Sequence, residues 1–386
     1  MIRFALALLA IPVFAFEPSR VRNPSQEPSQ VTAHEWGTFT SVARADGSSA
    51  RWAPLSGPSD LPCFVESLGS PQFKQLSSGL VRMETPVVYF YSAQPTTLSV
   101  RVGFPQGWIT EWYPRATSTI PIALRSEPPL SHAGGEIRWD RVEVLPDQVP
   151  VLPVSKGASH YFAARATDAA PIRIGNQWEK LIFYRGVGDF AVPLRPIITS
   201  EGRVRVTNAG SEPVPVAILF ENRGEKIGYR IIRSLNEATE ISLPELTSDL
   251  NALRGQLANE LVEFGLYRKE ALAMIETWHD SWFEEGMRLF YIVPKATVDR
   301  LLPLEIKPAP ASIARVFVGR IEMLSPAIRE TIETAAKTGD SERLAKFGRF
   351  LGPWITQMEN ERTGILRTEA VRRNFQKPSA PASCVQ

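Results

Sequence analysis

The sequence predicts an α+β protein, in which an antiparallel β-sandwich-like N-terminal region precedes a mainly α-helical C-terminal region. From about Thr32 to Ser234, short β-branched and aromatic runs alternate with Pro, Gly, Asn and Ser. This pattern is typical of antiparallel sheets packed face to face. After about Ser242 the apolar period changes from two residues to about 3.6, which indicates amphipathic helices.

The N-terminus has the features of a secretory signal peptide. Arg3 precedes an apolar run from Phe4 to Phe16, and small side chains lie at Val13 and Ala15. The run is too short to cross a bilayer, so we expect cleavage after Ala15. A buried N-terminal helix or strand is the alternative. Residues 1–15 are therefore assigned to the signal peptide and 16–31 to a flexible linker.

The length of the remaining chain favours two regions, because single hydrophobic cores stop growing near about 250–300 residues. We place the β-sandwich-like region at 32–238, the mainly helical region at 239–375 and a disordered tail at 376–386. Cys63 and Cys384 are the only cysteines. They allow one intramolecular disulfide, with a free or intermolecular thiol as the alternative.

The strand pattern is clearest between residues 87 and 232. Gln106-Gly107 separates two apolar runs as a tight turn does. The segment GRVRVTNAGSEPVPVAILFEN (202–222) resembles paired strands of an immunoglobulin-like or fibronectin-like sandwich, a resemblance that implies fold and not activity. The runs expected to form strands are 87–92, 97–104, 108–114, 136–145, 160–166, 180–186, 203–208, 214–222 and 226–232.

The helical pattern begins with capping-box spacing from Ser242 to Glu245. An apolar stripe at Leu246, Leu250, Leu253, Leu257 and Leu261 follows, and Gly265 is expected to end this helix. A second helix is predicted from about 268 to 285, and two more near 327–337 and 341–359. The apolar runs 288–294 and 314–324 are candidates for strands within this region.

Charge and hydropathy exclude two classes of partner. The net charge is +2, from 43 Lys and Arg against 41 Asp and Glu, and the two signs are interleaved. Nucleic acid and anionic membrane surfaces are therefore not expected as partners.

No later run approaches the roughly 20 apolar residues of a membrane-spanning helix, so we expect no transmembrane segment in the mature chain.

The stretch AHEWGTFTS places His34 and Glu35 side by side. Thr38 occupies the place of the second histidine in H-E-x-x-H, and the surrounding residues alternate with a strand period. Neighbours on a strand point to opposite faces, so the pair is not expected to form half of a metal site. A face bearing His34 and Trp36 is expected either to line a ligand pocket or to pack as an ordinary strand.

Trp108 and Trp112 lie on one face of the run GWITEWYP, roughly 13 Å apart. Two flat apolar rings at this spacing suit successive sugar units, with Thr110 between them as a hydrogen-bonding group. Packing between two sheets is the alternative.

Glu276 and His279 are three residues apart on a predicted helix and share a face. One such pair is half of a carboxylate–histidine metal site, which His132 or His160 would have to complete. A solvated helix face is the alternative. The cofactor, if there is one, is unknown.

These features lead us to expect an exported soluble protein, periplasmic or extracellular, with a binding or assembly role and a glycan or envelope protein as partner. The alternative is a secreted hydrolase, metal-dependent or carboxylate-based, with its site in a cleft between the two regions. That alternative requires His34, Glu35, Asp189, Glu276 and His279 to converge.

Overall fold

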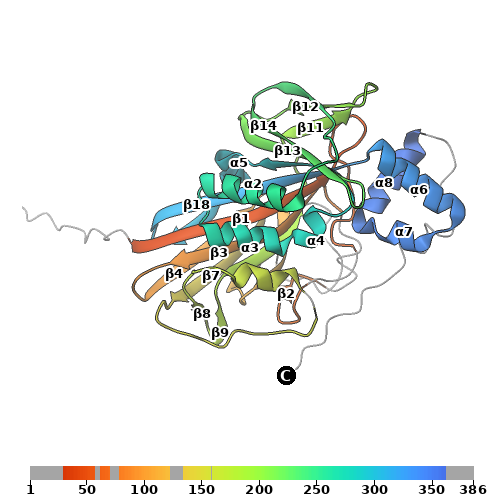
Figure 1. Cartoon of the computed structure of the whole chain (residues 1–386). Coiled ribbons are helices and arrows are strands. Elements are labelled where there is room, and N and C mark those ends of the chain that lie inside the picture. Colours follow the sequence, from red (N-terminus) through yellow and green to blue (C-terminus); the bar gives the residue numbers. More distant parts are fainter. Residues whose placement is uncertain (1–28, 57–60, 70–77, 122–133, 158, 362–386) are drawn as a thin grey trace, which may run out of the picture.

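The computed structural model describes residues 29–56, 61–69, 78–121, 134–157 and 159–361. A nine-stranded sheet runs through its centre (Figure 1). The strands β1 and β18 pair in parallel, and the other neighbouring pairs are antiparallel. In spatial order the strands are β14 (Ile227–Leu235), β13 (Val214–Asn222), β16 (Gly286–Ile292), β18 (Pro310–Met323), β1 (Ser29–Val42), β3 (Val81–Tyr91), β10 (Ile182–Gly188), β5 (Gly107–Tyr113) and β2 (Glu66–Ser67).

Two smaller sheets lie over one face of this central sheet. The six-stranded sheet contains β17 (Leu304–Lys307), β4 (Thr96–Phe104), β7 (Gly135–Val144), β8 (Ile172–Ile174) and β9 (Gln177–Glu179), with β6 (Ser118–Ile120) paired to β7. The three-stranded sheet contains β11 (Leu194–Ile198), β12 (Arg203–Asn208) and β15 (Ala238–Ser242).

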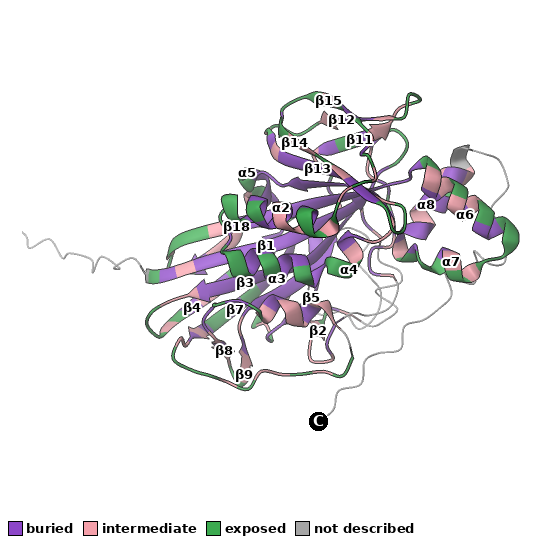
Figure 2. Ribbon diagram, in the orientation of Figure 1, coloured by how far each residue is buried: buried purple, intermediate pink, exposed green. Residues whose placement is uncertain are grey.

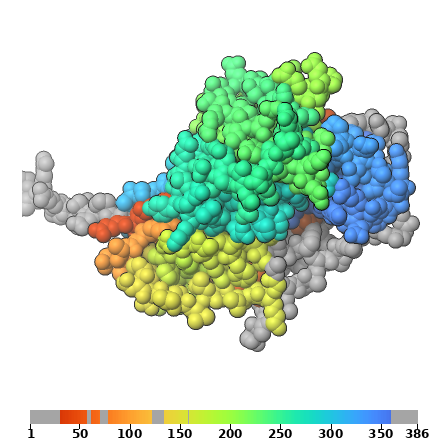
Figure 3. All heavy atoms as spheres, in the orientation of Figure 1, coloured from red at the N-terminus to blue at the C-terminus, as the bar shows by residue number. Residues whose placement is uncertain are grey.

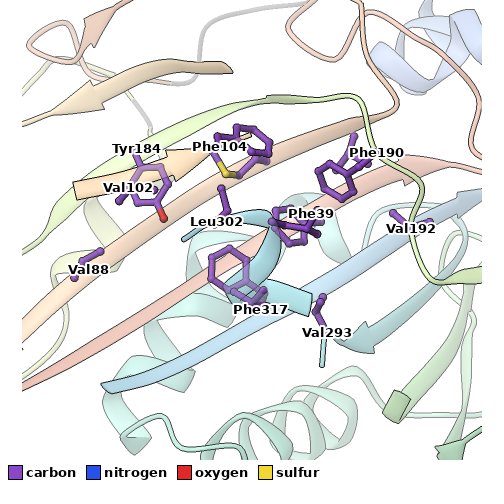
Figure 4. Packing of buried hydrophobic residues seen from close by; sticks show 14 of the residues in the cluster. Phe39, Val88, Val102, Phe104, Tyr184, Phe190, Val192, Val293, Leu302 and Phe317 are labelled. Carbon is purple, nitrogen blue, oxygen red and sulfur yellow. The ribbon is translucent and has the colours of Figure 1, made fainter. Parts of the chain in front are cut away.

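The largest hydrophobic core fills the space between the central sheet and the two smaller ones. Figure 4 shows its middle, where Phe39 of β1 lies between Phe317 of β18 and Phe190. The ring centroids of Phe39 and Phe317 are 5.1 Å apart, and those of Phe39 and Phe190 are 5.4 Å apart. Alternate residues of β1 and β18 supply this layer, as strand geometry requires.

Helices cover the other face of the central sheet, with buried strands beneath and exposed outer helix surfaces (Figure 2). These helices are η1 (His160–Arg165), α2 (Leu250–Glu263), α3 (Arg268–Thr277) and α4 (His279–Trp282), while α5 (Lys295–Leu301) contacts β18. A third core forms where α6 (Pro326–Thr338), α7 (Ser341–Ala345), η2 (Gly348–Phe350) and α8 (Leu351–Glu361) meet Val42 and Trp52. None of the helices in the described ranges combines the length and apolarity needed to cross a membrane.

The predicted α+β fold class is wrong. The described chain is mostly β, with 43% strand and 23% helix, and its C-terminal part is not mainly helical. The runs 288–294 and 314–324 form β16 and β18, which lie beside β1 and β13 in the central sheet. The helices between Leu250 and Glu361 therefore pack against a β structure. Their apolar faces are buried against its strands and loops.

Three predicted helices and one predicted strand differ from those observed. The helix expected at 341–359 is divided into α7, η2 and α8, and the run 160–166, expected as a strand, forms η1. The first predicted helix begins at Leu250, where the Asp249 side chain accepts a hydrogen bond from the Ala252 N–H, and not at Ser242, which ends β15. The predicted helix from 268 to 285 is interrupted at Trp278, between α3 and α4. The stripe of Leu253, Leu257 and Leu261 is buried as predicted.

Bulges interrupt β3 and β5, the two strands that flank β10 in the central sheet. In β3, Thr85 and Pro86 together oppose Gly37 of β1, and Thr85 has a positive φ of 45°. In β5, Thr110 is the extra residue opposite β10. A β-branched residue with positive φ is rare, and bulges redirect strands and the side chains they carry.

Gly186 allows β10 and β5 to approach closely at their bulge. A Cβ at this position would lie 2.0 Å from the Trp108 carbonyl oxygen, which belongs to the neighbouring backbone. Only glycine fits there without moving a strand.

We therefore expect Gly186→Ala to lower the free energy of unfolding by about 2 kcal/mol or more, because backbone must move. Gly255→Ala is the matched control, since a Cβ at Gly255 in α2 meets nothing within 4 Å. Alanine there should stabilise the helix by about 0.5–1 kcal/mol. Urea unfolding measures both variants, and equal effects would contradict the close approach.

Candidate functional site

The two tryptophans predicted to bind sugar are buried. Trp108 and Trp112 are 2% and 5% exposed, and both belong to the core between the sheets. Thr110 between them is also buried and donates a hydrogen bond to Glu111. These residues do not form a surface platform, because the six-stranded sheet covers this face of β5.

His34 and Glu35 point to opposite faces of the central sheet, as expected for strand neighbours. The Glu35 carboxylate accepts hydrogen bonds from Tyr184 and from Arg315, whose Nε lies 2.6 Å away. His34 faces the helices instead, and Trp36 is fully buried on the same side.

The imidazole of His34 is held by helix α3. Its Nδ1 lies 2.8 Å from Glu270 Oε2, and the Tyr91 hydroxyl donates to the other oxygen of Glu270 at 2.8 Å. Glu270 also accepts the Tyr267 backbone N–H, and the rings of Tyr267 and His34 are 4.4 Å apart. Glu270 therefore caps α3 and ties it to β1 and β3.

Glu276 and His279 lie on the protein surface. Glu276 pairs with Arg254 at 2.7 Å, and His279 Nδ1 lies 3.7 Å from Glu276 Oε1. His160 contacts Asp280 at 3.4 Å, whereas His132 lies outside the described residues. Within the described ranges, no three His, Cys, Asp or Glu side chains are grouped as a metal site.

The five residues named for a hydrolase do not converge, although Glu276 and His279 lie 3.7 Å apart on the surface. Glu35 lies between the sheets, His34 contacts α3, and Asp189 pairs with Arg51 at 2.7 Å. Glu35, His34, Asp189 and the Glu276–His279 pair contact different partners, so the described structure does not unite them in one cleft.

A buried charge network on the helix-facing side of the central sheet was not predicted. Glu322 of β18 accepts a hydrogen bond from Arg320 Nε at 2.6 Å and forms an ion pair with Arg288, whose Nε lies 2.9 Å away. Arg320 also binds Glu284 at 3.0 Å. Both arginines and Glu322 are at most 2% exposed. The only sequence signal was that Arg320 and Glu322 continue the helix-facing positions of an otherwise apolar strand.

Further charges extend the network across β1 and β3. Glu84 accepts the Thr40 hydroxyl at 2.8 Å and pairs with Arg82 at 3.1 Å. Arg349 from the C-terminal helices lies 3.6 Å from Glu84, and Phe350 packs under the guanidinium of Arg320. The network thus ties these helices to the sheet.

The ionisation of the network follows from burial and from neighbouring charges. Burial lowers the pKa of Arg288 and raises the pKa of Glu284. Burial opposes the charge of Arg320 as well, but the carboxylates of Glu322, Glu284 and Glu84 outweigh it and raise the pKa of Arg320. Arg320 therefore remains cationic within the network.

A pocket of about 450 Å³ opens where β1 and β18 end. Its lining residues are Ala43, Arg44, Ala45, Pro196, Ile198, Thr199, Ser200, Met323, Leu324, Pro326, Arg329, Glu330, Glu333 and Gln357. Ile198, Met323 and Leu324 supply apolar wall, while Arg44 and Glu330 are charged and exposed. Figure 3 shows the C-terminal helices, in blue, packed against the rest of the protein at this end.

A shallower groove of about 590 Å³ lies between β14 and β15. Its charged residues already have partners, since Arg233 binds Glu260 and Glu240 binds Arg205 at 2.6 Å. Arg44 and Glu330, in contrast, form no ion pair within the described part of the chain. The pocket at the strand ends is thus the better candidate for a ligand site.

Removal of one member of the network should strongly destabilise the protein. We expect Glu322→Gln to cost about 3 kcal/mol or more, because Arg288 and Arg320 would remain buried beside a neutral side chain. Glu305→Gln is the control, since Glu305 pairs with Lys307 on the surface and should change little. Urea unfolding compares the two, and a Glu322→Gln protein as stable as the wild type would show that the network is dispensable.

Comparison with known proteins gives no further guide to function. No protein-family model matches this chain, and no curated protein matches it.

Proposed function

We propose that the protein is exported and acts outside the cytoplasm as a binding or assembly protein for a component of the cell envelope. The partner is a protein rather than a glycan, because the tryptophans that alone favoured a glycan are buried. The signal-peptide features of residues 1–15 support export.

The pocket at the ends of β1 and β18 carries this proposal. Its volume is within the range of ligand sites, which is about 300–1,000 Å³, and it combines apolar wall with a few charged groups. The buried charges of the sheet are engaged with one another, so they hold the pocket walls in place. Arg44 and Glu330 at the pocket remain available for a partner.

The test is saturable association of the mature chain with washed cell envelopes. Ser200→Trp places a large side chain at the exposed turn lining the pocket and should weaken association at least tenfold. Ser211→Trp alters an exposed serine that lines none of the pockets described above and should bind like the wild type. Protease treatment of the envelopes should abolish binding.

Three outcomes would contradict the proposal. Absence of saturable association excludes an envelope partner, and equal binding by the Ser200→Trp and Ser211→Trp proteins excludes the pocket. Loss of binding after digestion of the glycan, and not of protein, would identify a glycan partner.

Export makes a separate prediction. The chain recovered from the periplasm or medium should begin at Phe16, because cleavage follows the small residue Ala15. Intact-mass spectrometry measures this, and Ala15→Arg should block cleavage. Recovery of the uncleaved wild-type chain in the cytoplasm would contradict export.

A further inference from the structure

The charged groups of the pocket indicate what kind of ligand it takes. Its charged lining residues are two arginines, Arg44 and Arg329, and two glutamates, Glu330 and Glu333. The sum of their charges is zero, so the pocket favours a ligand that is neutral overall. A singly charged anion would pair only with an arginine of the lining, and a singly charged cation would pair only with a glutamate.

The separation of the two available charges makes the preferred ligand dipolar. Arg44 follows β1, whereas Glu330 lies on α6, so they reach the pocket from different parts of the fold. They lie farther apart than an ion pair, since no contact within 4.0 Å joins them among the described residues. A ligand with a carboxylate for Arg44 and an ammonium for Glu330 would pair both.

In addition to these charges, the pocket lining includes apolar residues. Met323 and Leu324 are at most 8% exposed, and Ile198 of β11 is partly buried. An apolar side chain of the ligand would cover this wall and remove it from water. A carboxylate, an ammonium and an apolar side chain occur together in a short peptide with free ends.

We propose that this pocket binds a short zwitterionic peptide, whose carboxylate pairs with Arg44, whose ammonium pairs with Glu330, and whose apolar side chain packs on Ile198 and Leu324. The inference rests on the proposed function, in that both require this pocket to be a binding site. It adds the class of ligand that the pocket recognises.

The test is calorimetric titration of the full mature chain with alanyl-leucyl-alanine. The free tripeptide should bind, and its N-acetylated or C-amidated form should bind at least tenfold more weakly, because each modification removes one charge. The free amino acid leucine is a further probe. If leucine binds more tightly than the tripeptide, the ligand is an amino acid and the peptide assignment is overturned.

Variants of the two charged residues test which group of the ligand each one binds. Arg44→Glu and Glu330→Arg should each weaken tripeptide binding at least tenfold, whereas the double variant restores it, because the peptide can bind in the opposite direction. Both side chains are exposed, so the variants should fold. Lys337→Glu on the same helix is a control and should leave binding unchanged.

The outcomes separate this inference from the proposed function. If the tripeptide fails to bind, or if both capped forms bind as well as the free one, the zwitterionic ligand is excluded. If the Ser200→Trp substitution still weakened envelope association, the proposed function would remain supported. Tripeptide binding without envelope association would overturn the envelope role alone.

Discussion

The parallel pairing of β1 with β18 is the constraint on which the rest of the structure depends. It joins residues 29–42 to residues 310–323, so most of the chain forms loops and sheets around this one pair. Glu35 and Arg315 are register partners, and their side chains form an ion pair at 2.6 Å in the interior. Arg315 also reaches Asp299 and the Leu302 carbonyl, which anchors α5. A shift of register by one residue would separate these charges and turn the side chains of the shifted strand to the opposite face of the sheet.

The two faces of this strand pair bury charge in different ways. Toward the smaller sheets, Glu35 is shared by Arg315 and Tyr184, and burial together with Glu35 raises the pKa of the Tyr184 hydroxyl, which therefore donates its proton in a hydrogen bond. Toward the helices, Glu322 is shared by Arg288 and Arg320. Burial of a charge costs free energy unless the charge is fully paired. These groups therefore destabilise folds that would leave a buried charge unpaired more than they stabilise the native fold.

The buried charge network and the pocket occupy different parts of the fold. The carboxyl ends of β1 and β18 lie side by side, and the chain leaves both strands at the same place. The C-terminal helices are held there by contacts of Arg349 and Phe350 with the charge network. The pocket lies where these parts meet, and Arg44 and Glu330 of its lining are exposed. In the function we propose, binding there would need little ordering of the protein, which preserves affinity.

Local patterns in the sequence determined much of the secondary structure. Alternation predicted the strands around 203–208 and 214–222, and the leucine stripe predicted the buried face of α2, because these periods depend on neighbouring residues alone. The tertiary structure determined what covers each face. Trp108 and Trp112 share a face as the sequence implies, but β7 and its neighbours bury them. The pairs Glu322–Arg288 and Glu84–Arg349 and the pocket between Arg44 and Glu330 join residues far apart in the chain, and local periodicity carries no information about such contacts.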